Sequence, residues 1–478
     1  MAQSRISTGL SDLDSIIKGG LVKQKAYLYR GDAGTGKSTA GYHFLEEGLK
    51  QGESTLLITL GESQENVLQN VSQMGIDLSK SVFLDLSPSD DMFAEAGNYS
   101  VFPSAEVESD PITDEIINAI NRHKPTRVML DSLTILQHLT QDTFQYRNMV
   151  LSFIRFVCSK GATLVMTSES DVDKRDDEAE FWVDGIINFI HTPYWRQLNV
   201  KKFRGSDFHS GNHSFIITGN GISVYQQLQP GALKRTFEST RHSFGINGMD
   251  TMLAGGIERG TITMVTGPTG VGKTNLGIQF MKEAASRNDR SVIYTFEESV
   301  DVIIKRSKLI GVPVDEMIET GNLQIKYIPP FGYSPDEFSN MVQTDIEKNN
   351  TKNVMIDTVK AYSLSVRDGN SLERLHSLCI YMGNMGVTTF LISETPNITG
   401  EFVTTNLNAS YLADNIIFLR YMEINGELRK AIGVLKKRLS DFEKTIRELT
   451  ISSNGITVSE PLTHLRGILS GLPQRIDE

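Results

Sequence analysis

The sequence has little cysteine and no long apolar stretch. Cys158 and Cys379 are the only cysteines among 478 residues, which excludes a disulfide-stapled scaffold, and we expect both to be buried thiols in a reducing compartment. No run of about 18 apolar residues occurs, as a membrane-spanning helix would need. The first residues form no apolar signal segment. These absences predict a cytoplasmic protein without a membrane partner.

Signals for metal clusters and for nucleic-acid binding are also scarce. The nine histidines show no His-Glu-x-x-His pattern. We expect His209 and His213, which lie in a segment rich in Gly and Asn, to be exposed rather than metal-bound. The formal net charge is −11, so a surface that coats nucleic acid is not expected.

What the sequence does contain is two phosphate-binding loop motifs. Residues 31–38 and 267–274 both fit G-x-x-x-x-G-K-[ST], 236 residues apart. In this motif, backbone N–H groups surround nucleotide phosphates, the lysine reaches the terminal phosphate and the Ser or Thr holds Mg²⁺. The candidate nucleotide-binding residues are Gly31, Gly34, Thr35, Gly36, Lys37, Ser38 and Thr39 in the first loop, and Gly267, Thr269, Gly270, Val271, Gly272, Lys273, Thr274 and Asn275 in the second.

The loops belong to a longer duplication. Three further pairs of segments keep nearly the same spacing: 9–14 with 245–250, 19–20 with 255–256, and 220–222 with 454–456. The nearly constant offset predicts two copies of one domain rather than a short solenoid repeat. We place the domains at residues 1–235 and 236–478.

Each half alternates strand-like and helix-like segments. This pattern predicts an α/β fold with a mostly parallel sheet flanked by helices. A helix is expected at 37–50, and residues 88–111, acidic with little periodicity, are expected to form a long surface loop. The expected strands are 26–30, 55–60, 127–131 and 162–167 in the first half, and 261–266, 291–296, 353–357 and 387–392 in the second.

Acidic residues at strand ends are candidates for metal binding and catalysis. Asp131 and Asp357 each end an apolar strand segment and are followed by a hydroxyl residue. With Ser38 and Thr274 they are the expected Mg²⁺ ligands; the alternative is an Asp that caps the next helix.

A catalytic base is expected after the next strand along the sheet. Glu297 and Glu298 follow that strand in the second half, where the first half has Gly61 and Glu62. Glu297, Glu298 and Glu62 are therefore candidate catalytic residues, although Glu62 also fits the start of a surface helix.

A pair of basic residues recurs late in each half. Lys202 and Arg204 correspond to Lys436 and Arg438. On a strand the two side chains of each pair share one face. They are candidates to reach phosphates bound by a neighbouring subunit, as an arginine finger does; the alternative is a solvated basic strand.

These motifs together resemble the KaiC family, the double-domain RecA-like ATPases of the bacterial circadian clock. The resemblance covers essentially the whole chain, including residues 296–299 and 411–427. It implies two tandem RecA-like domains, two-tiered homohexamers with Mg-ATP between subunits, ATP hydrolysis in the first domain and reversible serine/threonine autophosphorylation in the second.

The resemblance also implies particular modification sites and partners. It places the phosphorylated serine at Ser410 and the neighbouring threonine position at Tyr411, while Thr405 matches another family threonine. It leaves room for a KaiB-like partner. Control by KaiA is not expected, because the chain ends soon after the last family motif. Gly61 departs from the family pattern and puts hydrolysis in the first domain in question.

Two other classes of function stay open on the sequence alone. One is a RecA-like DNA-binding motor, which the acidic charge and the lack of a basic–aromatic run disfavour. The other is a non-catalytic scaffold that uses ATP only to close a ring.

Overall fold

A computed structural model describes residues 4–87, 110–138, 143–170, 179–366, 370–395, 409–470 and 473–475. By its internal contacts the chain divides into two compact units, residues 1–227 and 228–478. Thr405 lies outside the described residues, as does most of the predicted loop at 88–111.

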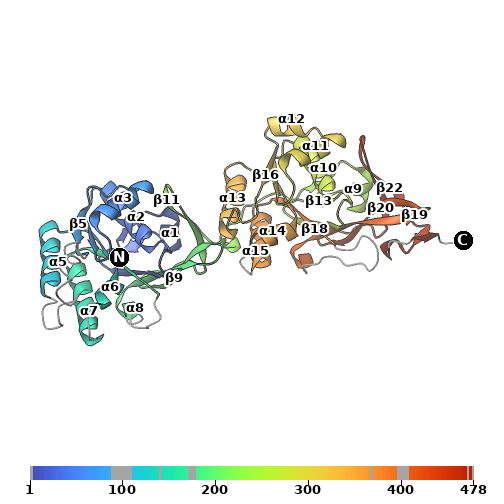
Figure 1. The fold of residues 1–478 in the computed structure, drawn as a ribbon. Helices are drawn as coiled ribbons and strands as arrows, with labels where there is room; N and C mark the ends of the chain where they lie inside the picture. Colours follow the sequence, from blue (N-terminus) through green and yellow to red (C-terminus); the bar gives the residue numbers. More distant parts are fainter. Residues whose placement is uncertain are drawn as a thin grey trace. The chain divides into compact units, whose positions relative to one another are not determined.

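The first unit is built on a nine-stranded sheet with the order β11-β10-β9-β8-β3-β7-β6-β4-β5 (Figure 1). The strands from β8 to β5 in this order run parallel, and β9, β10 and β11 extend the sheet antiparallel. Their bounds are β3 (Ala26–Gly31), β4 (Thr55–Thr59), β5 (Val82–Asp85), β6 (Arg127–Asp131), β7 (Thr163–Ser168), β8 (Gly185–His191), β9 (Arg196–Phe203), β10 (His213–Thr218) and β11 (Gly221–Tyr225).

Helices cover both faces of this sheet. Side chains alternate across a strand, so in β6 Met129 packs with Phe44 of α2 on one face, whereas Val128 and Leu130 pack with Ile120 of α5 on the other. The helices are α1 (Ser11–Ile16), α2 (Lys37–Lys50), α3 (Gln64–Gln73), α5 (Asp110–His123), α6 (Leu133–His138), α7 (Thr143–Ser159) and α8 (Ala179–Trp182).

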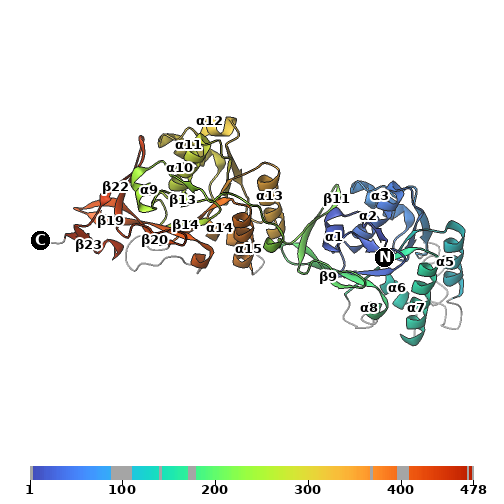
Figure 2. The same ribbon diagram turned by 180° about the vertical axis from the view of Figure 1, so that it is seen from behind.

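The second unit repeats the design, with the sheet order β16-β15-β17-β18-β14-β19-β20-β21-β22 (Figure 2). Its strands are β14 (Ile262–Gly267), β15 (Ser291–Thr295), β16 (Leu323–Tyr327), β17 (Asn353–Asp357), β18 (Thr388–Glu394), β19 (Asn415–Ile424), β20 (Glu427–Lys437), β21 (Arg447–Ser452) and β22 (Gly455–Pro461). Its helices are α9 (Asn247–Met252), α10 (Lys273–Ser286), α11 (Val300–Leu309), α12 (Val314–Glu319), α13 (Pro335–Glu347), α14 (Val359–Ser365) and α15 (Ser371–Asn384).

Short elements complete the two units. The two-residue strands pair as β1 (Arg5–Ile6) with β2 (Leu21–Val22), β12 (Arg241–His242) with β13 (Ile257–Glu258), and β23 (Leu465–Arg466) with β24 (Gln474–Arg475). The 3₁₀ turns are η2 (Pro230–Ala232), η3 (Ala409–Leu412) and η4 (Ile468–Ser470).

The predicted fold class is confirmed: both units are α/β, with a mostly parallel sheet between helical layers. The eight predicted strands match observed ones to within two residues at either end. The sequence reasoning did not resolve the antiparallel extension of each sheet, nor the parallel strands β5, β8, β16 and β19. The edge strands β5 and β16 have few fully buried residues and therefore carry a weaker apolar signal. Part of the predicted loop is wrong, since α5 already begins at Asp110.

The structure tests the expected exposure of His213 and the expected burial of the two cysteines. The expected exposure of His213 is wrong: its ring is fully buried, and its Nδ1 accepts a hydrogen bond from the Gln227 N–H at 2.9 Å. Cys379 is buried, as expected, and Cys158 is half-buried; both are free thiols. Within the described parts of the chain, every helix is too short or too polar to cross a membrane.

Candidate nucleotide-binding sites

Each phosphate-binding loop connects the central strand of its sheet to a long helix, β3 to α2 and β14 to α10. The loops turn on glycines in left-handed conformations: Gly36 has φ 102° and Gly272 has φ 114°. A Cβ at Gly272 would also lie 2.4 Å from Ile451 Cδ1, but it is the left-handed conformation that favours glycine there. The loops end at helix N-termini, where free backbone N–H groups favour anions.

The motif lysines lie buried over their own loops. Lys37 Nζ donates to the carbonyl oxygens of Gly31 and Asp32, both at 2.7 Å, and Lys273 Nζ donates to that of Pro268 at 2.9 Å. Burial lowers the pKa of both lysines, against the opposing effect of nearby carboxylates. Each ammonium group is therefore already placed beside the loop that a phosphate would enter.

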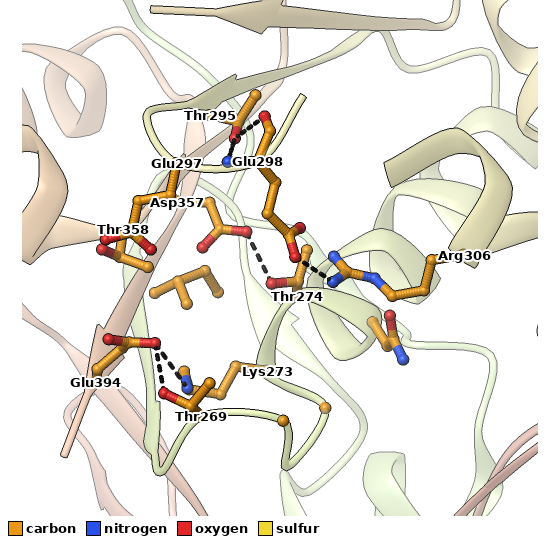
Figure 3. Close-up of a pocket in the computed structure, with 14 residues that line it drawn as sticks. Thr269, Lys273, Thr274, Thr295, Glu297, Glu298, Arg306, Asp357, Thr358 and Glu394 are labelled. Carbon is orange, nitrogen blue, oxygen red and sulfur yellow. Dashed lines mark hydrogen bonds and ion pairs between the residues drawn. The ribbon is translucent and has the colours of Figure 1, made fainter. Parts of the chain in front are cut away.

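The second loop opens into a pocket of about 210 Å³ (Figure 3). It is lined by Thr269, Gly270, Gly272, Lys273, Thr274, Asn275, Thr295, Glu297, Glu298, Arg306, Asp357, Thr358, Ile392 and Glu394. Most of the predicted second-site residues are thus brought together. Val271 instead points its side chain into the core, which leaves only its backbone to face a ligand.

A hydroxyl and a carboxylate meet at the predicted metal position of the second site. Thr274 Oγ1 donates to Asp357 Oδ2 at 2.7 Å. Burial raises the pKa of Asp357 to about 6, because removal from water disfavours the charged form of a carboxyl group. These hard oxygen donors fit the coordination preference of Mg²⁺.

The two adjacent carboxylates of the second site have different surroundings. Glu298 Oε1 accepts a hydrogen bond from Arg306 Nη1 at 2.7 Å (Figure 3). No described residue donates a hydrogen bond to the carboxylate of Glu297. Burial raises the pKa of Glu297, helped by the negative charges of Glu394 and Glu298 and opposed by Lys360 and Lys273.

Glu394 and Arg306 line the pocket but escaped the sequence reasoning. Glu394 Oε1 accepts from Thr269 Oγ1 at 3.0 Å and lies 4.0 Å from Lys273 Nζ. It ends β18, so extending the search for acidic strand ends to the next strand would have found it. Arg306 lies on α11, and only the folded chain brings it to Glu298.

The first site is arranged differently. Asp131 accepts hydrogen bonds from the hydroxyls of Tyr42, at 3.5 Å, and Thr167, whereas Asp357 is bound by the loop residue Thr274. Glu62 Oε1 accepts from Asn70 Nδ2 at 2.5 Å.

The remaining predicted residues of the first loop lie around its turn. Thr35 Oγ1 donates to the Asp32 carbonyl at 2.8 Å. Gly34 has φ 74°. Ser38 and Thr39 occupy the first turn of α2.

The basic pairs are held at the ends of β9 and β20. Lys202 Nζ donates to the Glu180 carbonyl at 2.6 Å and Arg204 Nη2 to the Phe181 carbonyl at 3.3 Å. Lys436 Nζ donates to the Ala413 carbonyl at 2.5 Å, and Arg438 Nη1 lies 3.4 Å from an Asp414 carboxylate oxygen. Neither Lys436 nor Arg438 lines the pocket of its own unit.

The predicted phosphorylation residues lie in η3. Ser410 is half-buried, and Tyr411 is 49% exposed with its ring edge-on to His376 at 5.3 Å between centroids. Ser410 is not among the residues that line the second pocket of its own chain.

Comparison with known proteins assigns the chain to a family. The family model described as "ATPase: KaiC" matches twice, at residues 6–229 and 242–463. The circadian clock oscillator protein KaiC of Parasynechococcus marenigrum (strain WH8102) is 28% identical over 494 residues, covering 100% of this chain and 94% of that protein. The circadian clock protein KaiC3 of Synechocystis sp. is 28% identical over 484 residues, covering 98% of this chain and 94% of that protein. Because the family model accounts for both halves, the chain belongs to the KaiC family of ATPases.

Proposed function

We propose that this protein is an Mg-ATP-dependent ATPase and serine autokinase of the clock or stress-regulatory type, with phosphoryl transfer at the second site. The observation that carries the proposal is the pocket that Glu297 lines together with Lys273 and the Thr274–Asp357 pair. Four buried polar atoms there, Asn275 Oδ1, Glu298 Oε2, Arg306 Nε and Arg306 Nη2, have no hydrogen-bond partner among the described residues. Buried polar atoms are normally bonded, so they suit a pocket that takes a polar ligand.

Binding would use the loop and its lysine. The N–H groups of residues 269–274 would surround the phosphates of ATP, and Lys273 would exchange its carbonyl partner for the terminal phosphate. Thr274 and Asp357 are the proposed Mg²⁺ ligands. Bound Mg²⁺ would neutralise charge that develops on the phosphates.

Glu297 is the proposed general base. Its raised pKa moves it toward the range in which a carboxylate accepts a proton efficiently near neutral pH. It takes the hydroxyl proton of Ser410 from an adjacent subunit as Ser410 Oγ bonds to the γ-phosphorus, and the bond to the ADP oxygen breaks. With water as the nucleophile, the same step is hydrolysis.

The first domain is proposed to bind ATP as well. The family resemblance implies that it also hydrolyses ATP. In the turn after β4 that expectation depends on the carboxylate of Glu62, because Gly61 has no side chain. We keep residues 1–235 and 236–478 as the proposed limits of the two nucleotide-binding domains.

We further propose a homohexamer with nucleotide between subunits. Lys436 and Arg438 sit away from the pocket of their own unit, which suits a role in completing a neighbour's site. A KaiB-like protein is a candidate partner, whereas KaiA, nucleic acid and membrane are not proposed as partners.

The test is replacement of Glu297. The Glu297→Gln variant should lose phosphate incorporation at Ser410 while still binding ATP, because an amide cannot take the proton. Intact-mass measurement and phosphopeptide mapping after incubation with Mg-ATP check this. Glu316→Gln, the same change on exposed α12, is the matched control. Incorporation by Glu297→Gln at the rate of the control would refute the assignment.

A further inference from the structure

The turns that follow β4 and β15 are built alike in the two units. The Leu60 N–H donates to the Asp131 carbonyl at 2.9 Å, and the Phe296 N–H donates to the Asp357 carbonyl at 3.0 Å. A threonine at the end of each strand then bonds to the backbone of the turn, Thr59 to Glu62 and Thr295 to Glu298. Because these bonds correspond one to one, Gly61 occupies the structural position of Glu297.

The space in front of Gly61 is filled rather than left open. A Cβ at Gly61 would lie 2.6 Å from Ile135 Cδ1 on α6, so the end of the Ile135 side chain would have to move to admit a larger residue at position 61. Ile135 comes four residues after Asp131, and the corresponding residue of the second unit, four after Asp357, is Ala361. At these two positions the first unit has Gly61 and Ile135, whereas the second unit has Glu297 and Ala361. In the first unit the larger side chain of the two belongs to α6, and its end lies where a side chain at residue 61 would begin.

The side chains around Gly61 also differ from those around Glu297, and the differences again disfavour a catalytic base in the first unit. Lys360, whose charge acts on Glu297, is replaced by Thr134, a buried residue whose Oγ1 accepts from the Glu169 N–H at 3.0 Å. Glu62 is the counterpart of Glu298, not of Glu297, and its carboxylate is turned to Asn70. The first unit therefore has a counterpart of Glu298, which is Glu62. It has no counterpart of the proposed base Glu297 or of the neighbouring cation Lys360.

The groups of the first site that would bind the nucleotide are nevertheless present. The loop has its left-handed Gly34 and Gly36, and Lys37 lies buried over the loop carbonyls. Nucleotide binding depends on these groups, whereas hydrolysis needs in addition a positioned base.

We infer that the first site is a nucleotide-retaining site, which binds ATP without hydrolysing it because Gly61 supplies no base and Ile135 occupies the adjoining space, and that ATP turnover in this protein belongs to the second site. The inference rests on the proposed function and restricts it, since the hydrolysis that the resemblance implies for the first domain does not occur there. The retained ATP acts as a structural ligand of the first domain.

The test identifies the nucleotide held at each site in the full-length chain. Lys273→Ala weakens binding at the second site; after prolonged incubation with Mg-ATP, rapid desalting and acid quenching, chromatography should find ATP rather than ADP on this variant. In parallel, Glu297→Gln should lower steady-state ADP release roughly 10²-fold or more, the usual range for loss of a general base. ADP bound to Lys273→Ala, or turnover in Glu297→Gln that Lys37→Ala abolishes, would overturn the inference.

A gain-of-function variant tests the role of Ile135 in the space beside residue 61. In the Glu297→Gln background, the double change Gly61→Glu with Ile135→Ala should raise ADP release at least about tenfold, because it transplants the base and the space that it needs. Gly61→Gln with Ile135→Ala is the matched control, equal in shape but unable to take a proton. A double variant that binds ATP yet releases no more ADP than this control would refute the role of the pair.

Failure of this inference can be told apart from failure of the proposed function. Phosphate on Ser410 that depends on Glu297 tests the second site alone, whatever nucleotide the first site holds.

Discussion

At the scale of single residues, the same position of the duplicated domain carries different chemistry in the two halves. Position 43 shows this on helix α2. His43 is 8% exposed, and its Nε2 accepts a hydrogen bond from the Ile222 N–H at 2.9 Å; the corresponding residue of the second half is Gln279. The hydrogen bond requires a neutral ring, because a protonated Nε2 cannot accept.

This histidine predicts acid sensitivity of the first unit. Burial lowers the pKa of His43; Lys50 adds to the effect and Glu46 opposes it. The unfolded chain binds a proton at about pH 6.5 and the folded chain only at lower pH. The stability is therefore fully present above about pH 6.5 and falls as the pH drops toward the folded pKa. His43→Gln, which introduces the residue of the second half, should flatten this loss.

Tryptophan fluorescence provides the measurement. Both tryptophans, Trp182 and Trp195, lie in the first unit, so urea unfolding followed by fluorescence between pH 7.5 and pH 5 reports on that unit. An equally steep loss of stability in wild type and His43→Gln would contradict the prediction.

At the scale of elements, the proposed second site depends on how α14 begins. The helix starts directly after Asp357, and Thr358 caps it: the Thr358 hydroxyl accepts from the Ala361 N–H at 3.1 Å. The cap holds the first turn of the helix at the end of β17. Ser132 stands at the corresponding position of the first unit, so a hydroxyl follows the aspartate in both halves.

Removal of this cap should loosen the first turn of α14, which lies next to Asp357. Thr358→Ala should cost about 1 kcal/mol, as loss of a helix N-cap does, and should speed hydrogen exchange of the Ala361 amide. Thr358→Ser, which introduces the residue of the first half, should keep both near wild type. Exchange at Ala361 that is as slow in Thr358→Ala as in Thr358→Ser would show that the cap does not matter.

At the scale of the whole molecule, the proposed hexamer would build each catalytic site from two subunits. Glu297 lines the pocket, whereas Lys436 and Arg438 do not. A neighbour's pair can complete the site only in an assembled ring.

Mixing two inactive variants tests this arrangement. Glu297→Gln lacks the base, and a chain with both Lys436→Ala and Arg438→Ala lacks the basic pair, so each should assemble with ATP but fail to phosphorylate Ser410. Mixed rings contain interfaces with an intact base facing an intact basic pair, and phosphate incorporation should reappear. Native mass spectrometry checks that hexamers form, and an inactive mixture of assembled rings would contradict completion of the site by a neighbour.

Much of the fold and of the binding loops could be predicted because their signals are local. Each loop is contiguous in sequence, and its glycines are needed for the left-handed backbone conformation of the loop itself. The nearly constant offset between matching segments revealed the duplication. The strands that carry Asp131 and Asp357 are short apolar runs, which a parallel sheet covered on both faces requires.

Other features were decided only by the tertiary structure. The placement of Arg306 beside Glu298, of Glu394 beside Lys273, and of Ile135 against Gly61 joins residues from different elements of a unit. The burial of His213 likewise depends on the strands around it. The sequence by itself determined where phosphates would be bound, because backbone conformation and residue spacing are written along the chain. Only the packed structure decided which site has room for a catalytic carboxylate, because that depends on the volume of side chains brought together from separate strands and helices.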